Sequence, residues 1–204
     1  MNGSRIARLV LIATGLALAA CSGDPSAEAA YPDEPPLAGA DIGGPLALQT
    51  AGGADYGEAQ LAGKWRLVYF GFTFCPDVCP VDMQRMGQVY KRLQAEAPDV
   101  AARLQPIFVS VDPARDTPDI AQEFATGFDP DFVGLSGSEA QVQAAVDEYR
   151  VYRAVQPPRD DGYYTVDHSA YVYLVDDKGQ AVNFYERADS VDKVVADIRH
   201  WMTA

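Results

Sequence analysis

The sequence predicts an α/β fold in which a central mixed β-sheet is flanked by helices. Two segments, 67–70 and 107–111, are short, rich in β-formers and almost continuously apolar, as strands buried on both faces of a sheet are. Between them, apolar side chains recur at helical spacing from Met86 to Ala97, and Pro98 follows. Residues 66–111 are therefore predicted to form one βαβ unit.

Later segments extend this pattern. Thr117 and Pro118 are typical of a helix start, and the buried face of that helix is assigned to Ile120, Ala121, Phe124 and Phe128. A second helix is predicted over 139–149, two strands over 170–175 and 181–185 around a turn at 176–179, and a closing helix over 191–202. The pattern fits a thioredoxin-like fold with N-terminal and hairpin insertions, and by itself it does not exclude a small flavodoxin-like domain.

Composition limits the function classes. The 204 residues are 48% hydrophobic and 22% charged, which suits one core in one domain. Lys and Arg number 16 against 29 Asp and Glu, a net charge of −13. This charge repels a phosphate backbone, so we expect no nucleic-acid partner.

The N-terminus carries an export signal. Arg5 and Arg8 precede an apolar run over 9–20 that is too short to span a bilayer. The run ends in Leu-Ala-Ala-Cys, which resembles the bacterial lipoprotein box, although a plain signal peptide would also fit. We expect residues 1–20 to be a lipoprotein signal peptide, and residues 21–40 to be a lipidated Cys21 followed by a flexible tether rich in Ala, Pro, Asp and Glu. The domain at 41–204 is then predicted to lie outside the cytoplasm, lipid-anchored to a bacterial membrane.

Cys75 and Cys79 stand where the first predicted strand leads into the helix, in the segment FGFTFCPDVCP. At i and i+4 they are predicted to share one face of the first helical turn. Free amides and the helix dipole stabilise thiolates there, for redox attack or for metal ligation. A disulfide closing so short a loop adds little stability, so a structural bond is a weaker interpretation. Three intervening residues, one more than in the CxxC redox motif, leave room for a metal ion.

His168 is the candidate third ligand, expected just before a strand beside the helix start. The other histidine, His200, is assigned to the last helix. Two thiolates and one imidazole suit Cu(I), or Cu(II) with a further oxygen ligand, whereas zinc favours four protein ligands. Met83 and Met86 have the spacing of a core stripe, and Asp167 is a candidate to orient His168.

Three segments, 69–80, 110–118 and 166–170, together resemble the Sco (SenC/PrrC-type) family of thioredoxin-fold copper proteins, which assist assembly of the Cu-A centre of cytochrome c oxidase. The resemblance covers roughly residues 41–203. It implies that Cys75, Cys79 and His168 bind one copper ion per chain, and that the cysteine pair cycles between dithiol and disulfide. It implies the Cu-A-bearing oxidase subunit as partner, with other periplasmic copper carriers or thiol reductants as further candidates. Many members have a transmembrane anchor, whereas this chain has a lipoprotein signal.

Three hypotheses remain. A copper metallochaperone would use all three residues, and is the primary prediction because dithiol exchange requires no distant imidazole. A thiol-disulfide reductase that keeps the oxidase subunit's cysteines reduced would need only Cys75 and Cys79, so whether the chain is an enzyme stays open. A peroxidase or redox sensor is the third, and here Thr73 lies near Cys75 but the sequence shows no arginine partner.

Overall fold

The computed structural model describes residues 31–203, and from Glu34 onward the chain forms one unit. The predicted signal peptide and Cys21 lie outside the described residues, as do residues 22–30 of the predicted tether. Among the residues that are described, none of the helices combines the length and the apolar character needed to cross a bilayer.

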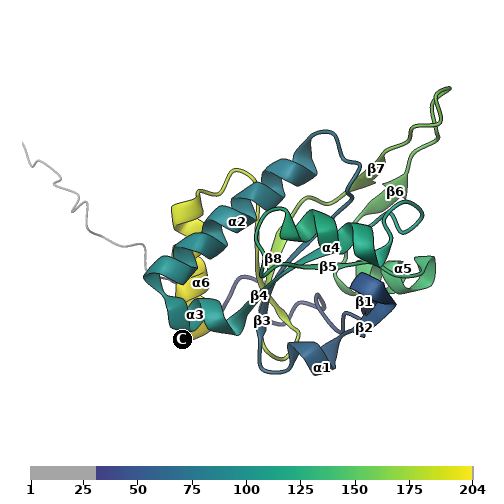
Figure 1. Cartoon of the computed structure of the whole chain (residues 1–204). Coiled ribbons are helices and arrows are strands. Elements are labelled where there is room, and N and C mark those ends of the chain that lie inside the picture. The colour runs from purple at the N-terminus through teal and green to yellow at the C-terminus, as the bar shows by residue number, and fades with distance from the viewer. Residues whose placement is uncertain (1–30, 204) are drawn as a thin grey trace, which may run out of the picture. The chain divides into compact units, whose positions relative to one another are not determined.

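A five-stranded mixed sheet forms the centre of the unit, in the order β5-β4-β3-β8-β9 (Figure 1). Three of its strands are parallel: β3 (Trp65–Gly71), β4 (Leu104–Ser110) and β5 (Val133–Leu135). The other two, β8 (Val172–Val175) and β9 (Ala181–Tyr185), continue the sheet antiparallel. The predicted βαβ unit and the later hairpin are confirmed, and the fold is the predicted thioredoxin-like α/β fold.

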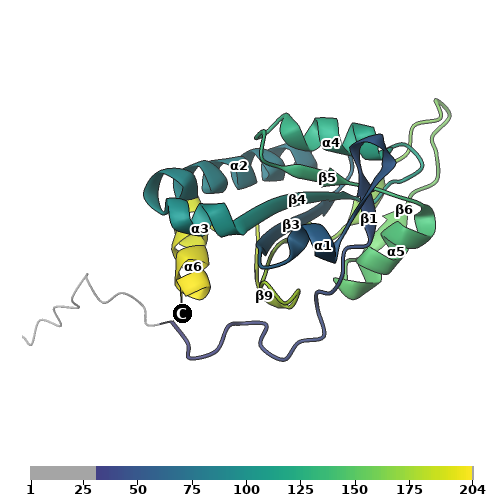
Figure 2. The ribbon, with the colours of Figure 1, turned by 60° about the horizontal axis from the view of Figure 1, so that its bottom comes forward.

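Helices α2 (Val78–Glu96) and α4 (Pro118–Thr126) are the crossovers that join β3 to β4 and β4 to β5. Both cover the same face of the sheet (Figure 2), as right-handed connections running in one direction require. Three further helices are α3 (Pro98–Arg103), α5 (Glu139–Glu148) and the closing α6 (Val191–Thr203), and α6 packs against α2.

Several boundaries differ from the prediction. Helix α2 begins at Val78, so Cys75 lies in the turn before it, because a residue that precedes proline disfavours helical backbone angles. The Thr117 hydroxyl caps α4 as predicted, accepting from the backbone N–H of Ile120. The side chain of Ile120, however, is 37% exposed, and α4 ends before Phe128, so two of the four residues assigned to its buried face were wrongly placed.

Two small ribbons lie outside the main sheet. Near the N-terminus, β1 (Leu48–Thr50) pairs with β2 (Ala54–Tyr56) around a short 3-10 turn (Ala51–Gly53), and a single helical turn, α1 (Glu58–Leu61), follows. Later, β6 (Arg153–Val155) pairs with β7 (Val166–His168), and the hairpin they form projects from the body (Figure 1). Sequence patterning did not assign strands to either ribbon, because each strand has only three residues.

Candidate metal and redox site

The loop between β3 and α2 holds Cys75 in a tight turn. The Cys75 backbone N–H donates to the Phe72 carbonyl at 3.2 Å, and its Sγ accepts from the backbone N–H of Cys79 at 3.5 Å. The prediction that both cysteines share the first helical turn is therefore wrong in detail, since only Cys79 lies in α2. The predicted contact with a free amide at the helix start still holds for Cys75, because the backbone N–H of Cys79 meets its sulfur.

Cys79 lies deeper than Cys75. Its side chain is 0% exposed against 9% for Cys75, and both are free thiols in the described part of the chain. Burial raises the pKa of the Cys79 thiol to about 12, although the backbone N–H of Phe72 favours the thiolate. Without a metal ion, Cys79 is therefore a neutral thiol at pH 7.

Gly71, the last residue of β3, makes this close packing possible. A Cβ placed there would lie 2.8 Å from the Tyr69 ring and 3.1 Å from the Cys79 sulfur. No larger residue fits at this position without displacing the thiol.

His168 ends β7 and faces Cys79, with Nε2 at 3.4 Å from the Cys79 Sγ. Its Nδ1 lies 2.9 Å from the Ser169 carbonyl, which can only accept a hydrogen bond, so Nδ1 carries the proton and Nε2 presents its lone pair to the sulfur. Burial lowers the pKa of His168, so the ring is neutral at pH 7. The rings of Phe72 and Tyr69 contact the imidazole edge-on, with centroids at 5.9 and 6.2 Å.

The structure does not give Asp167 the predicted role of orienting His168. Its carboxylate is exposed and accepts from the side-chain amide of Gln156 at 2.7 Å. The Ser169 carbonyl occupies that place instead. Met83 and Met86 are 0% and 2% exposed, which confirms their assignment to the core.

The structure thus brings Cys79 and His168 into contact and places Cys75 one hydrogen bond away from the backbone of Cys79. Within residues 31–203, no three His, Cys, Asp or Glu side chains already converge as a ready-made metal site. Among these residues, a third ligand does not lie beside Cys79 and His168, and Cys75 is the nearest candidate for it.

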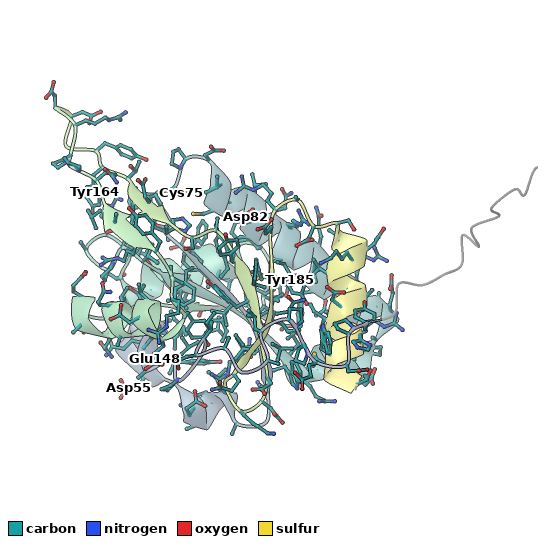
Figure 3. All side chains as sticks on the ribbon, turned by 180° about the vertical axis from the view of Figure 1, so that it is seen from behind. Asp55, Cys75, Asp82, Glu148, Tyr164 and Tyr185 are labelled. Atoms are coloured by element: carbon teal, nitrogen blue, oxygen red, sulfur yellow. The ribbon has the colours of Figure 1, made fainter. Side chains whose placement is uncertain are left out.

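Asp82, which sequence reasoning missed, is a buried carboxylate in α2 that is joined to the site through Tyr69. It is 4% exposed and accepts from the Tyr69 hydroxyl at 3.0 Å and from two nitrogens of Arg187 at 2.9 Å each. Figure 3 shows Asp82 on α2 and Cys75 in the turn before that helix. The partners lie 13 and 105 residues from Asp82 in the sequence, so no local motif signals the cluster.

Asp116 fixes the loop that precedes Cys75. Its fully buried carboxylate accepts from the Thr73 backbone N–H at 2.9 Å and the Thr73 hydroxyl at 2.6 Å, and from the Ser110 hydroxyl at 2.6 Å. Thr73 is therefore engaged in holding the loop. An arginine does lie nearby, since the Arg115 guanidinium is 5.1 Å from the Phe74 ring. In the sequence, the only signal for Arg115 and Asp116 was the resemblance of segment 110–118 to the family.

Comparisons with known proteins place the chain in a family. Residues 34–203 match the SCO1/SenC family. Protein SenC of Rhodobacter capsulatus is 41% identical over 160 residues, which cover 78% of this chain and 70% of SenC. Mitochondrial SCO1 and SCO2 relatives are also similar, and the matched part spans 54% to 57% of their lengths.

The similar solved structures belong to the same family. The structure of Bradyrhizobium japonicum ScoI with copper bound is similar with a TM-score of 0.69 and 37% identity, covering 78% of this chain and 99% of that one. BsSco, described as a member of the Sco family of cytochrome c oxidase assembly proteins, is similar with a TM-score of 0.61 and 25% identity, covering 78% and 92% of the two chains. With its fold, its cysteine loop and these matches, the chain belongs to the SCO1/SenC family.

Proposed function

We propose that this protein binds one copper ion through Cys75, Cys79 and His168, and delivers it during assembly of the Cu-A centre of cytochrome c oxidase. The observation that carries the proposal is the 3.4 Å contact between the Cys79 sulfur and Nε2 of His168. Thiol-disulfide exchange does not require an imidazole against the buried thiol, whereas metal binding uses both.

The donor set fits a soft ion. Thiolates and imidazole are the ligands that Cu(I) takes in proteins. The Cys79 sulfur and Nε2 of His168 lie 3.4 Å apart, so one ion could contact both atoms. Cys75 would complete the set by turning its sulfur from the Cys79 amide toward the other two ligands.

The surrounding residues prepare the two atoms already in contact. The Ser169 carbonyl holds the imidazole proton on Nδ1, so that Nε2 is free to bind. Burial keeps Cys79 protonated, so copper binding releases that proton to solvent. The Tyr69 and Phe72 rings restrict the orientation of the imidazole.

Relatives described as oxidase assembly proteins or as copper-bound support the Cu-A-bearing oxidase subunit as the recipient. As part of the same proposal, a lipid on Cys21 holds the domain at the extracytoplasmic face of a bacterial membrane, through the tether at 21–40. Other periplasmic copper carriers or thiol reductants would load or reduce the site.

Disulfide reduction is the second candidate, supported by the unequal burial of the two free thiols. The Cys75 thiolate would attack a disulfide of the oxidase subunit and form a mixed disulfide, releasing one target thiolate. Cys79 would then give up its thiol proton, attack the Cys75 sulfur and release the second target thiolate, which takes up a proton. The target gains two electrons as Cys75 and Cys79 become a disulfide, and an external dithiol restores them.

The experiment uses the full chain with Cys21→Ser, so that Cys75 and Cys79 are its only thiols. The reduced protein is titrated anaerobically with Cu(I) against a competing chelator, alongside Cys75→Ser, Cys79→Ser and His168→Ala. His200→Ala on α6 is the matched control. One tightly bound copper, weakened by each of the three substitutions and unaffected by the control, supports the proposal, and transfer to an isolated Cu-A domain is then measured. Copper binding that is insensitive to His168→Ala, in a protein that still exchanges disulfides, would leave the reductase as the function.

A further inference from the structure

The hairpin that carries His168 is not built into the main sheet. Its two strands share only three residue pairs, and they form a separate two-stranded ribbon. A two-stranded ribbon alone is marginally stable in water. The position of His168 therefore depends on what holds the hairpin to the body.

Contacts of Tyr163 and Tyr164 hold it on the side facing the cysteines, and the Tyr163 hydroxyl donates to the Phe74 carbonyl at 3.1 Å. Arg115 pairs with Asp112 at 2.5 Å and donates to the Tyr164 carbonyl at 2.9 Å. The Tyr164 hydroxyl donates back to Asp112 at 2.9 Å, and the Arg115 guanidinium lies 3.5 Å from the centre of the Tyr164 ring. We call Asp112, Arg115 and Tyr164 the clamp.

The clamp is shielded from solvent. The side chains of Arg115 and Asp112 are 18% and 2% exposed, so their charge pairing is little screened, and a planar guanidinium suits simultaneous pairing and ring stacking. Figure 3 shows Tyr164 on the hairpin at the same end of the molecule as Cys75. Tyr164 lies four residues before His168, so a shift of the backbone at Tyr164 reaches the histidine through β7.

The segment 111–116, which carries Asp112 and Arg115 of the clamp, also holds the loop that precedes Cys75. Asp116 accepts from the backbone and the hydroxyl of Thr73, and the backbone N–H of Val111 donates to the Gly71 carbonyl at 2.8 Å. The side chain of Arg153 in β6 donates to the Val111 carbonyl at 2.6 Å. Both halves of the site are thus anchored to residues 111–116.

We propose that Arg115 is a positioning residue that holds the hairpin so that Nε2 of His168 faces the Cys79 sulfur. It does not touch the metal ligands in this role. It acts through Tyr164, whose carbonyl, ring and hydroxyl it fixes together with Asp112. The consequence for copper rests on the proposed function, whereas the consequence for the hairpin does not.

The first test uses the metal-free reduced chain and compares Arg115→Lys with Arg159→Lys. Lysine keeps the charge and loses the planar fork. Arg159 is the matched control because it also lies over a tyrosine ring, that of Tyr163 at 4.7 Å, and pairs with an aspartate, but all of these contacts stay within the hairpin.

The readout is amide hydrogen exchange at Gln156, whose N–H donates to the Thr165 carbonyl across the hairpin. Arg115→Lys is expected to accelerate this exchange about tenfold, while amides of β4 keep their protection. Tyr164→Phe, which removes only the hydroxyl contact, is expected to give a smaller acceleration, and Arg159→Lys less than about twofold. Equal exchange in wild type and Arg115→Lys overturns the proposal, and so does equal acceleration in β4, which would signify general destabilisation.

The second test measures Cu(I) affinity in a double-mutant cycle. Arg115→Lys is expected to weaken copper binding about tenfold and to add nothing in a His168→Ala background, because its effect is carried by the histidine. An equal loss in both backgrounds would overturn the proposal. The two proposals fail separately: a wild-type chain that binds no copper refutes the proposed function and leaves the exchange result standing. Copper binding with an unaltered hairpin in Arg115→Lys refutes only the positioning role.

Discussion

The hydroxyl of Tyr69 in β3 donates to the carboxylate of Asp82 in α2 at 3.0 Å, and the Tyr69 ring also contacts the imidazole of His168. Arg187, from the connection between β9 and α6, supplies two more hydrogen bonds to the same carboxylate. One buried acidic group thus joins the central sheet, the helix that carries Cys79 and the last loop of the fold.

Replacing Asp82 with alanine is expected to lower the free energy of unfolding by about 1–3 kcal/mol, because the Tyr69 hydroxyl and the Arg187 guanidinium lose their acceptor. Urea unfolding measures the change. Asp192→Ala, which removes an exposed carboxylate that pairs with Arg92, serves as the control and is expected to cause no measurable loss. An equal effect of the two substitutions would refute a structural role for the buried carboxylate of Asp82.

Copper affinity is expected to rise with pH. The pKa of Cys79 is raised to about 12 by burial, so its proton must leave throughout the range from pH 6.5 to 8.5. The release of this proton alone contributes about a tenfold rise in the apparent binding constant for each pH unit. His168, whose pKa burial lowers, adds no further dependence in this range. Chelator competition at several pH values, together with proton-release measurements, tests the slope, and a flat profile would mean that Cys79 is not a ligand.

Stability is expected to fall in alkaline solution. Burial raises the pKa of Tyr149 to about 12, with Arg66 opposing it, and burial also raises that of Tyr173 to about 12. The folded state therefore keeps these phenols neutral, and their contribution is complete below the ordinary pKa near 10. It is lost as the pH rises from about 10 to about 12, because the unfolded chain ionises first.

Urea midpoints between pH 8 and 11.5 measure this loss. Tyr149→Phe should make the midpoint less sensitive to pH above 10, whereas Tyr152→Phe, at a residue that is 62% exposed, should leave the profile as in wild type. If both variants follow the same curve, ionisation of buried tyrosine is not the cause.

Two glycine substitutions are expected to have opposite effects. Gly71→Ala places a methyl group 2.8 Å from the Tyr69 ring and 3.1 Å from the Cys79 sulfur, and such overpacking costs about 1–3 kcal/mol. Gly87→Ala lies inside α2, where the added carbon meets its nearest neighbour at 3.4 Å. There the substitution should stabilise by about 0.5–1 kcal/mol through helix propensity. Thermal unfolding of both variants tests the pair, and a stable Gly71→Ala protein would contradict the packing described around Cys79.

The sequence was informative where one residue type dominated a segment. Strands β3 and β4 are nearly uninterrupted apolar runs, and α2 repeats apolar residues at helical spacing, so the centre of the fold could be predicted. Cys75, Cys79 and His168 could be selected because the chain has few soft ligands. The start of α2 was misplaced at Cys75, because the restriction imposed by Pro76 is weaker in the pattern than the pairing of two cysteines.

The features that the sequence could not predict depend on contacts between groups that lie far apart in the chain. Three-residue strands such as β6 and β7 have no measurable period. Arg115 and Asp112 contact their hairpin at Tyr164, from 49 and 52 residues earlier in the chain. The orientation of His168 comes from a backbone carbonyl, which no residue type reveals. The same is true of Asp82, whose partners are known only once the chain has folded.

The separation of 89 residues along the chain between Cys79 and His168 also governs when the site forms. The thiols of a nascent or unfolded chain lie close together in sequence, but their histidine arrives only after β4, α4, β5, α5 and the hairpin have folded into place. Contacts of such long range are late and slow to form. A chain that has not finished folding therefore has the two thiols without the imidazole beside them. Contact between the Cys79 sulfur and the His168 imidazole thus indicates that folding is complete.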